Sequence, residues 1–333
     1  MAEAAATNYL LDIQDLDVGF EAQQGLAHAL RGLNIRLCPA ETHALVGESG
    51  SGKTVASMCI MGLLAIPPGK VNHGKIIFQQ RDLQQLTENQ RRKVRGKDIG
   101  MIFQEPGKYL NPAYKIGEQI TESLILHLHM EKKAATEKAL ELLSLVGLGK
   151  NRRVLSSYPH ELSGGMKQRA MIAMAIACHP ALLIADEPTT ALDVTLQLQI
   201  LRLLLKLKDK FGMGILFISH DLGVVKEIAD KVSVIYAGKI IESTTKKQLF
   251  ENPLHPYTKL LLLSIPDAAK RGERLRAIPG NVPDAEHIPA GCSFHPRCPL
   301  AEDACRAEIP PDIDYGDGHQ AACFLIGKKW IVS

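Results

Sequence analysis

The octet Gly-Glu-Ser-Gly-Ser-Gly-Lys-Thr at residues 47–54 constrains this chain more than any other segment. An apolar run from Thr42 to Val46 precedes it and suits a strand, and the residues from Val55 to Leu64 suit a helix. A glycine-rich turn between a strand and a helix aims backbone N–H groups and the positive end of the helix dipole at an anion. An ordinary Gly/Ser turn is the alternative, and the flanking strand and helix argue against it. The pattern therefore predicts a nucleoside triphosphate site, with contacts from Gly47, Gly50, Ser51, Gly52, Lys53 and Thr54.

Two side chains of the octet carry distinct chemistry. The Lys53 ammonium is expected to reach the β- and γ-phosphates. The Thr54 hydroxyl is expected to ligate Mg²⁺.

Length and charge limit the class of protein. A length of 333 residues suggests about two domains. The 39 basic and 36 acidic residues nearly balance, at a formal net charge of +3, which argues against a nucleic-acid partner bound by phosphate neutralisation. The first residues, 1–8, lack a signal-peptide pattern, and no run of 18 apolar residues occurs. We expect a soluble or peripheral protein made in the cytosol.

The chain alternates predicted strands with predicted helices. Apolar runs suggest strands at residues 10–18, 29–37, 42–46, 75–78, 99–103, 181–185 and 214–219. Helical spacing suggests helices at residues 116–146, 166–177 and 194–211. This order is typical of an α/β layer with a mostly parallel sheet. Beyond about Pro266 the periodicity fades and prolines and cysteines crowd in, so a domain boundary is expected there.

Polar side chains follow two of the apolar strands directly. Asp186 and Glu187 come after residues 181–185, and His220 comes after residues 214–219. Ligands of α/β sheets bind at this carboxyl edge. Asp186 can hold Mg²⁺, Glu187 can orient or deprotonate an attacking water, and His220 can contact the γ-phosphate. A solvated acidic turn and a structural histidine are the plainer alternatives.

A second phosphate-type helix start lies at Ser163, Gly164 and Gly165. The surrounding residues 162–169, Leu-Ser-Gly-Gly-Met-Lys-Gln-Arg, resemble the signature motif of ATP-binding-cassette (ABC) ATPases. Further motifs of that family follow in the same order over about residues 10–250, and no motif is degenerate. They are the adenine-stacking aromatic at Phe20, the Q-loop glutamine at Gln104, the D-loop aspartate at Asp193 and the switch histidine at His220.

The resemblance implies a fold and a mechanism. The implied fold is an ABC-type P-loop domain, with a parallel-sheet core, an antiparallel β subdomain and a helical subdomain, at residues 8–264. The helical subdomain would lie at about residues 105–160. Two such cassettes would close around two ATP molecules, so that Ser163, Gly164 and Gly165 serve the partner's ATP. Glu187, His220, Gln104 and Lys53 would be the catalytic residues, and Thr54 and Asp186 would serve Mg²⁺.

Two stretches resemble one subfamily, the importers of peptides and nickel. They are Tyr109-Leu110-Asn111-Pro112 after the Q-loop, and Asn252-Pro253-Leu254-His255-Pro256-Tyr257-Thr258 after the cassette. The resemblance implies ATP-driven import of di- or oligopeptides, or of nickel or another small solute. The implied partners are a second ATPase subunit, commonly a paralogue, two membrane permease subunits and an extracytoplasmic solute-binding protein. The chain would then sit on the cytoplasmic face of the membrane.

The C-terminal region, residues 265–333, holds Cys292, Cys298, Cys305 and Cys323. Four thiols in a turn-rich segment of a cytosolic protein favour a metal site over disulfides. The residues alone leave zinc and an iron–sulfur cluster open. The resemblance favours a [4Fe-4S] cluster in a small Cys-rich module, because some peptide-importer ATPases carry one in this tail.

The sequence disagrees with two other classes of function. A cassette acting in DNA repair or translation would carry coiled-coil insertions or two cassettes per chain, and this chain has neither. A nucleotide-regulated metal-binding scaffold without turnover disagrees with the intact Asp186, Glu187 and His220.

Overall fold

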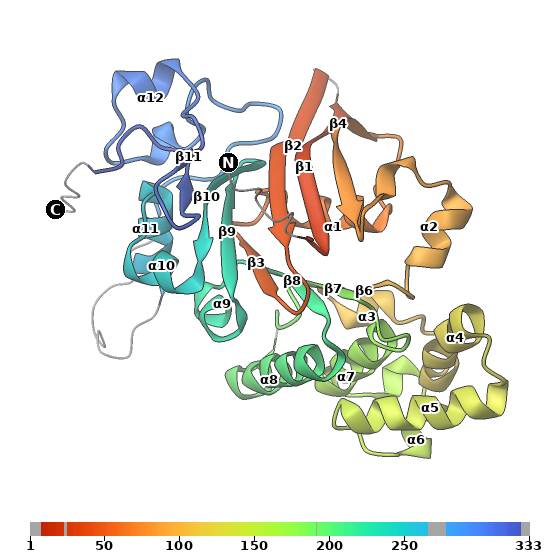
Figure 1. Ribbon diagram of the computed structural model, residues 1–333. Coiled ribbons are helices and arrows are strands. Elements are labelled where there is room, and N and C mark those ends of the chain that lie inside the picture. Colours follow the sequence, from red (N-terminus) through yellow and green to blue (C-terminus); the bar gives the residue numbers. More distant parts are fainter. Residues whose placement is uncertain (1–7, 23–24, 191, 266–277, 328–333) are drawn as a thin grey trace, which may run out of the picture. The chain divides into compact units, whose positions relative to one another are not determined.

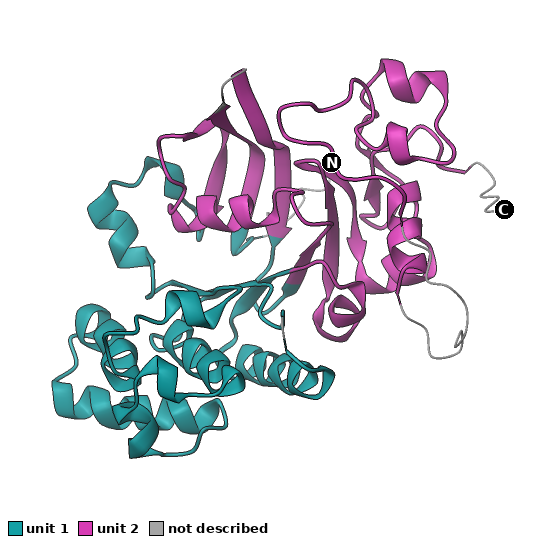
Figure 2. Cartoon of the chain, turned by 180° about the vertical axis from the view of Figure 1, so that it is seen from behind, with its two compact units in different colours: residues 1–11, 37–42, 78–218 teal, residues 12–36, 43–77, 219–333 magenta. Residues whose placement is uncertain are grey.

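The computed structural model describes residues 8–22, 25–190, 192–265 and 278–327. The chain divides into two compact units, each built from several stretches of sequence (Figure 2). The first unit consists of residues 1–11, 37–42 and 78–218, and the second of residues 12–36, 43–77 and 219–333. The expected boundary near Pro266 and the D-loop residue Ala191 lie outside the described residues.

The first unit contains three parallel strands in the order β8–β7–β6 and most of the helices (Figure 1). Its strands are β5 (Arg81–Asp82), β6 (Ile99–Ile102), β7 (Leu182–Asp186) and β8 (Gly214–Ser219). Its α-helices are α2 (Glu88–Val94), α3 (Pro106–Tyr109), α4 (Ile116–Leu128), α5 (Lys132–Leu145), α6 (Arg152–Ser156), α7 (Gly164–Ala175) and α8 (Val194–Phe211). Short 3₁₀ turns are η1 (Leu83–Gln85) and η2 (Pro159–Glu161).

The second unit contains two groups of strands, ordered β2–β1–β4 and β11–β12–β10–β9–β3. The strands are β1 (Leu11–Ala22), β2 (Gly25–Leu37), β3 (Thr42–Val46), β4 (Gly69–Phe78), β9 (Lys231–Tyr236), β10 (Lys239–Thr245), β11 (Ile313–Asp314) and β12 (Gln320–Ala321). The helices are α1 (Lys53–Met61), α9 (Leu222–Ile228), α10 (Lys246–Glu251), α11 (Pro256–Leu263), α12 (Asp303–Ala307) and the 3₁₀ turn η4 (His295–Arg297).

Burial explains why the apolar runs become parallel strands. Every residue of β3, β7 and β8 is buried, as expected for strands covered on both faces. The amphipathic α8 buries one stripe that includes Ile200, Leu204 and Leu207, and it begins and ends as the sequence predicted. The predicted helical region at residues 116–146 is two packed helices, because His129 takes a left-handed conformation between α4 and α5.

The C-terminal segment joins the sheet of the second unit. Strand β12 pairs antiparallel with β10, so that Glu242 lies opposite Ala321. Strand β11 then pairs with β12. Nothing in the local sequence of residues 313–321 predicted these short strands, because they are only two residues long each.

Candidate nucleotide-binding site

The phosphate loop, residues 47–54, connects the buried strand β3 to helix α1 in the second unit. Its geometry requires glycine at residue 52, which caps α1 with a left-handed φ of 104°. A Cβ atom at this position would lie 2.6 Å from the carbonyl oxygen of Ala29. Only glycine combines that φ with that close approach. The loop is therefore a specific structure and not an ordinary surface turn.

Lys53 and Ser51 bring their polar groups into the loop. The Lys53 ammonium donates hydrogen bonds to the carbonyl oxygens of Gly47 and Glu48, at 2.8 and 2.9 Å. The Ser51 hydroxyl is buried with no hydrogen-bond partner among the described residues. Thr54 is exposed in the first turn of α1. A buried ammonium and the N–H groups of a helix start can donate hydrogen bonds to phosphate oxygens, and a hydroxyl oxygen can ligate the magnesium ion.

The acidic pair lies at the end of β7 in the first unit. Asp186 is buried, with 3% of its surface exposed. Glu187 has a left-handed φ of 45°, which is a strained conformation for a residue with a side chain. Its N–H group donates to the carbonyl oxygen of Ile218 on β8, at 2.9 Å. The backbone is thus bent and held at the position where the sequence predicts the catalytic carboxylate.

The Glu187 carboxylate accepts two side-chain hydrogen bonds. The Gln104 amide and the Thr190 hydroxyl each donate to it at 2.9 Å. The structure thereby brings together two residues, Gln104 and Glu187, that the sequence assigned to one site from separate motifs. Thr190 was not identified from the sequence, since a threonine three residues after a glutamate carries no signal of its own.

The signature residues form the start of α7, also in the first unit. The Ser163 hydroxyl accepts a hydrogen bond from the N–H group of Met166 at 3.4 Å and so caps the helix. Further along the helix, the buried Gln168 amide donates to the carbonyl oxygen of Pro188 at 2.7 Å. This bond links α7 to the turn that follows Glu187. Gln168 lies within the signature motif, yet its role could not be predicted from the sequence.

The other predicted site residues with a described position are Asp193, His220 and Phe20. The Asp193 carboxylate caps α8 by accepting from the N–H group of Leu196 at 2.9 Å, in the first unit. His220 is exposed after β8, and Phe20 is partly buried on β1, both in the second unit.

The four C-terminal cysteines line one small cavity in the second unit, here called the cysteine cavity. Its walls are His255, Pro256, Cys292, Phe294, His295, Cys298, Cys305, Pro310, Cys323, Phe324 and Leu325. All four cysteines are free thiols, and burial raises the pKa of Cys298 and Cys323 to about 11. In the part of the chain that the structure describes, no three His, Cys, Asp or Glu side chains form a group that could hold a single metal ion.

No helix among the described residues is both long enough and apolar enough to cross a bilayer.

Two protein families match this sequence. Residues 30–190 match the family described as ABC transporter. Residues 241–305 match the family described as oligopeptide/dipeptide transporter, C-terminal region.

Individual proteins resemble the chain over most of its length. The oligopeptide transport ATP-binding protein AppD of Bacillus subtilis is 49% identical, over 96% of this chain and 98% of AppD. A putative peptide import ATP-binding protein of Brucella abortus is 50% identical, over 94% of this chain and 96% of its own length. Among solved structures, the dimeric post-hydrolysis state of the cassette MJ0796 with ADP and phosphate has a TM-score of 0.64 and 26% identity. That match covers 71% of this chain and 98% of MJ0796.

Proposed function

Because the chain belongs to the ABC transporter ATPases that carry the oligopeptide/dipeptide transporter C-terminal region, we propose that it hydrolyses ATP to power import of di- or oligopeptides. The proposal rests above all on the Glu187 carboxylate, which directly follows a buried strand and is hydrogen-bonded to Gln104. A carboxylate fixed in this way can orient and polarise a water molecule for attack on the γ-phosphate. The names of the relatives, which are peptide import ATP-binding proteins, support the cargo.

Each motif residue has a role in this proposal. Lys53 binds the β- and γ-phosphates, and Thr54 and Asp186 serve Mg²⁺. Gln104 and His220 respond to the γ-phosphate, and Phe20 stacks on the adenine. The backbone amides of Gly47, Gly50, Ser51 and Gly52, together with the Ser51 hydroxyl, complete the phosphate site. Ser163, Gly164, Gly165 and Asp193 act on the ATP of a second cassette.

The proposed assembly has several subunits. A second ATPase subunit pairs with this chain, two permease subunits span the membrane, and a solute-binding protein delivers the cargo. The chain would work on the cytoplasmic face of the membrane. Stimulation of ATP hydrolysis in the reconstituted complex by a pentapeptide, and not by Ni²⁺, is the expected result for a peptide importer. Stimulation by Ni²⁺ alone would contradict the cargo.

The substitution Glu187→Gln tests the enzymatic role. It keeps the size and hydrogen-bonding capacity of the side chain and removes the negative charge. Turnover of the assembled complex should fall by at least about 100-fold, while MgATP binding is retained. Thr190→Val is a useful companion, because it removes one hydrogen bond to the same carboxylate without removing the charge, and its effect should be much smaller. Near-normal turnover in Glu187→Gln would disprove the assigned role.

We also propose that Cys292, Cys298, Cys305 and Cys323 hold a [4Fe-4S] cluster. A four-iron cluster takes one thiolate for each iron, so its ligands surround a cavity, whereas zinc gathers four ligands around one ion. Four cysteines that line one apolar cavity fit the first arrangement. When bound, such a cluster would cross-link a segment that has little core of its own.

Anaerobic purification tests the cluster directly. The expected result is a broad visible absorption with about four irons and four sulfides per chain. A colourless protein with one zinc would contradict the cluster and leave the ATPase proposal intact. A Cys298→Ser variant should lose most of the iron, whereas Cys59→Ser, which alters a buried cysteine on α1, should keep it.

A further inference from the structure

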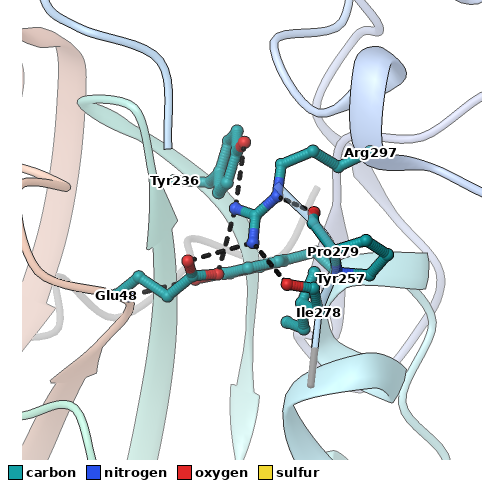
Figure 3. A network of polar contacts seen from close by, with 6 residues as sticks. All are labelled: Glu48, Tyr236, Tyr257, Ile278, Pro279 and Arg297. Carbon is teal, nitrogen blue, oxygen red and sulfur yellow. Dashed lines mark hydrogen bonds and ion pairs between the residues drawn. The ribbon is translucent and has the colours of Figure 1, made fainter. Parts of the chain in front are cut away.

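Glu48, the second residue of the phosphate loop, is held by three different groups, and Figure 3 shows two of them, Tyr257 and Arg297. Its N–H group donates to the Tyr257 hydroxyl at 3.0 Å, and its carbonyl oxygen accepts from the Lys53 ammonium at 2.9 Å. Its carboxylate accepts two hydrogen bonds from the Arg297 guanidinium, both at 3.1 Å. Two of the three contacts therefore come from residues 257 and 297, which lie beyond the phosphate loop and the strands next to it.

The Arg297 side chain is itself fixed from several sides. It donates to the carbonyl oxygens of Pro279 and Ile278, at 2.8 and 3.4 Å, and to the Tyr236 hydroxyl at 3.4 Å. The guanidinium lies over the ring of Tyr236, 5.8 Å from its centre. Only 6% of the Arg297 side chain is exposed, compared with 29% of the Glu48 side chain. A bidentate pair with a buried arginine fixes the position of its carboxylate as well as its charge.

The position of Arg297 depends on the wall of the cysteine cavity. Arg297 ends the turn η4 and directly precedes Cys298. Its N–H group donates to the carbonyl oxygen of Phe294 at 3.0 Å. The buried Phe294 lines the cavity and packs against Tyr236 and Tyr257, with ring centres 5.2 Å apart in both cases. Phe294 and Cys298 in the cavity wall are thus direct neighbours of the residues that hold the phosphate loop.

We propose that Arg297 is a positioning residue for the phosphate loop. It neutralises the charge of Glu48 and holds that residue in place, so that the loop can bind the triphosphate of ATP. This inference rests on the proposed function, since it takes ATP as the ligand of the loop. The triphosphate is an anion, and an unpaired carboxylate in the loop would repel it. Arg297 cancels that charge, and Tyr257 keeps the Glu48 backbone in place.

Single and double variants of Arg297 and Glu48 should differ in their affinity for MgATP. Arg297→Gln leaves the Glu48 carboxylate without its cation, so the affinity for MgATP should fall about tenfold. Glu48→Gln removes the repelling charge together with the ion pair, and its effect on affinity should stay below about threefold. In the double variant the repulsion is absent, so its affinity should lie close to that of Glu48→Gln. Arg297→Lys keeps the charge without the two-pronged geometry and should give an intermediate affinity.

The measurement is the dissociation constant of MgATP for the full-length chain, with the thermal midpoint of each variant recorded alongside. Arg306→Gln is the matched control, because Arg306 forms an exposed ion pair with Asp303 in the same segment. It should change neither quantity.

Three outcomes would overturn parts of this account, and they can be told apart. If Arg297→Gln binds MgATP like the wild type while its thermal midpoint falls, Arg297 only holds the C-terminal segment. A double variant as weak as Arg297→Gln would contradict the role of the Glu48 charge. If the wild-type chain itself fails to bind MgATP, the proposed function falls together with this inference.

Discussion

Two helix N-termini in this chain are proposed to face phosphate, and they are built in different ways. The start of α7 is made locally, by a Ser163 hydroxyl that caps an amide three residues later. The start of α1 has no side-chain cap and depends on Gly52 in a left-handed conformation. Distant residues hold the loop before α1. Gly238 donates its N–H group to Ser51, and Tyr257 and Arg297 hold Glu48.

The two helix starts are stabilised by contacts of different range along the sequence. A serine cap needs only a few consecutive residues, so the N–H groups at the start of α7 are satisfied by a local contact. A loop of glycines has many conformations in the unfolded chain, and tertiary contacts must select one of them. We therefore expect the phosphate loop to respond to substitutions far away in sequence, and the start of α7 to respond mainly to its own residues.

Lys53→Met should have the largest effect and should separate the two helix starts. The ammonium lies inside the phosphate loop, so its loss should weaken MgATP binding to the chain by at least about 100-fold. Isothermal titration of the full-length chain would measure this. Lys206→Met, on the exposed side of α8, is the control and should bind normally. Unchanged binding in Lys53→Met would mean that the loop is not the nucleotide site.

Gly52→Ala compared with Gly164→Ala tests the dependence on glycine. A Cβ atom at Gly52 meets the Ala29 carbonyl oxygen and requires a strained φ, so unfolding free energy should fall by about 3 kcal/mol. At Gly164 nothing lies within 4 Å of the added atom, and the change should stay below about 1 kcal/mol. Denaturant unfolding of both variants measures the difference. Equal losses would show that the two helix starts tolerate side chains alike.

Glu242 holds the segment that leads into Tyr257, one of the residues that contact the phosphate loop. It is fully buried on β10, accepts from the N–H groups of Leu254 and His255, and pairs with His319 at 2.8 Å. Burial acts to raise the pKa of Glu242, but the hydrogen bonds from His319 and the two amides outweigh it. The pKa therefore lies below its ordinary value of 4.5.

A lowered carboxyl pKa stabilises the fold above the pKa of the unfolded chain, and this contribution is lost as the pH falls through the folded pKa. The thermal midpoint of the wild type should therefore fall on acidification below about pH 4.5. Glu242→Gln should cost about 2 kcal/mol at neutral pH and should depend less on acid. Glu227→Gln, at an exposed position on α9, is the control. Identical acid profiles for Glu242→Gln and the wild type would contradict this role.

Ser163→Ala should have the smallest effect on the chain alone. Loss of the cap should cost about 1 kcal/mol of stability, and MgATP binding to the chain should not change. Turnover of the assembled complex should fall, because Ser163 is proposed to serve the partner's ATP. Thr245→Ala removes a similar cap from α10 and should cost stability without changing turnover. If Ser163→Ala weakened ATP binding to the isolated chain, the assignment of its helix to a second nucleotide would be wrong.

The sequence predicted those parts of the fold that depend on local pattern. Helix α8 and strand β8 have the predicted bounds, because α8 has apolar residues at helical spacing and β8 is a short continuous apolar run. The resemblance to ABC ATPases was confirmed by the family matches. The hydrogen bond between Gln104 and Glu187 joins residues that the sequence had assigned to one site, but the geometry itself came only from the structure.

Other parts depend on contacts that leave no local pattern. Arg297 and Glu48 are 249 residues apart, and an arginine in a turn-rich segment reads as a solvated side chain. The left-handed turn at His129 divides one predicted helical region into two, although histidine is not a usual helix breaker. In both cases tertiary packing decided the outcome, and a single sequence does not display it.

The short strand β12 also covers an edge of β10 that could otherwise pair with a strand of another molecule. Strand β10 would be the last strand of its group in the second unit without β12, and its N–H and C=O groups would then be open to pairing with another molecule. Two residues are enough to cover part of that edge, and the next strand, β11, is equally short and carries the exposed Asp314. A tail truncated before residue 313 would leave β10 as a template for edge-to-edge aggregation.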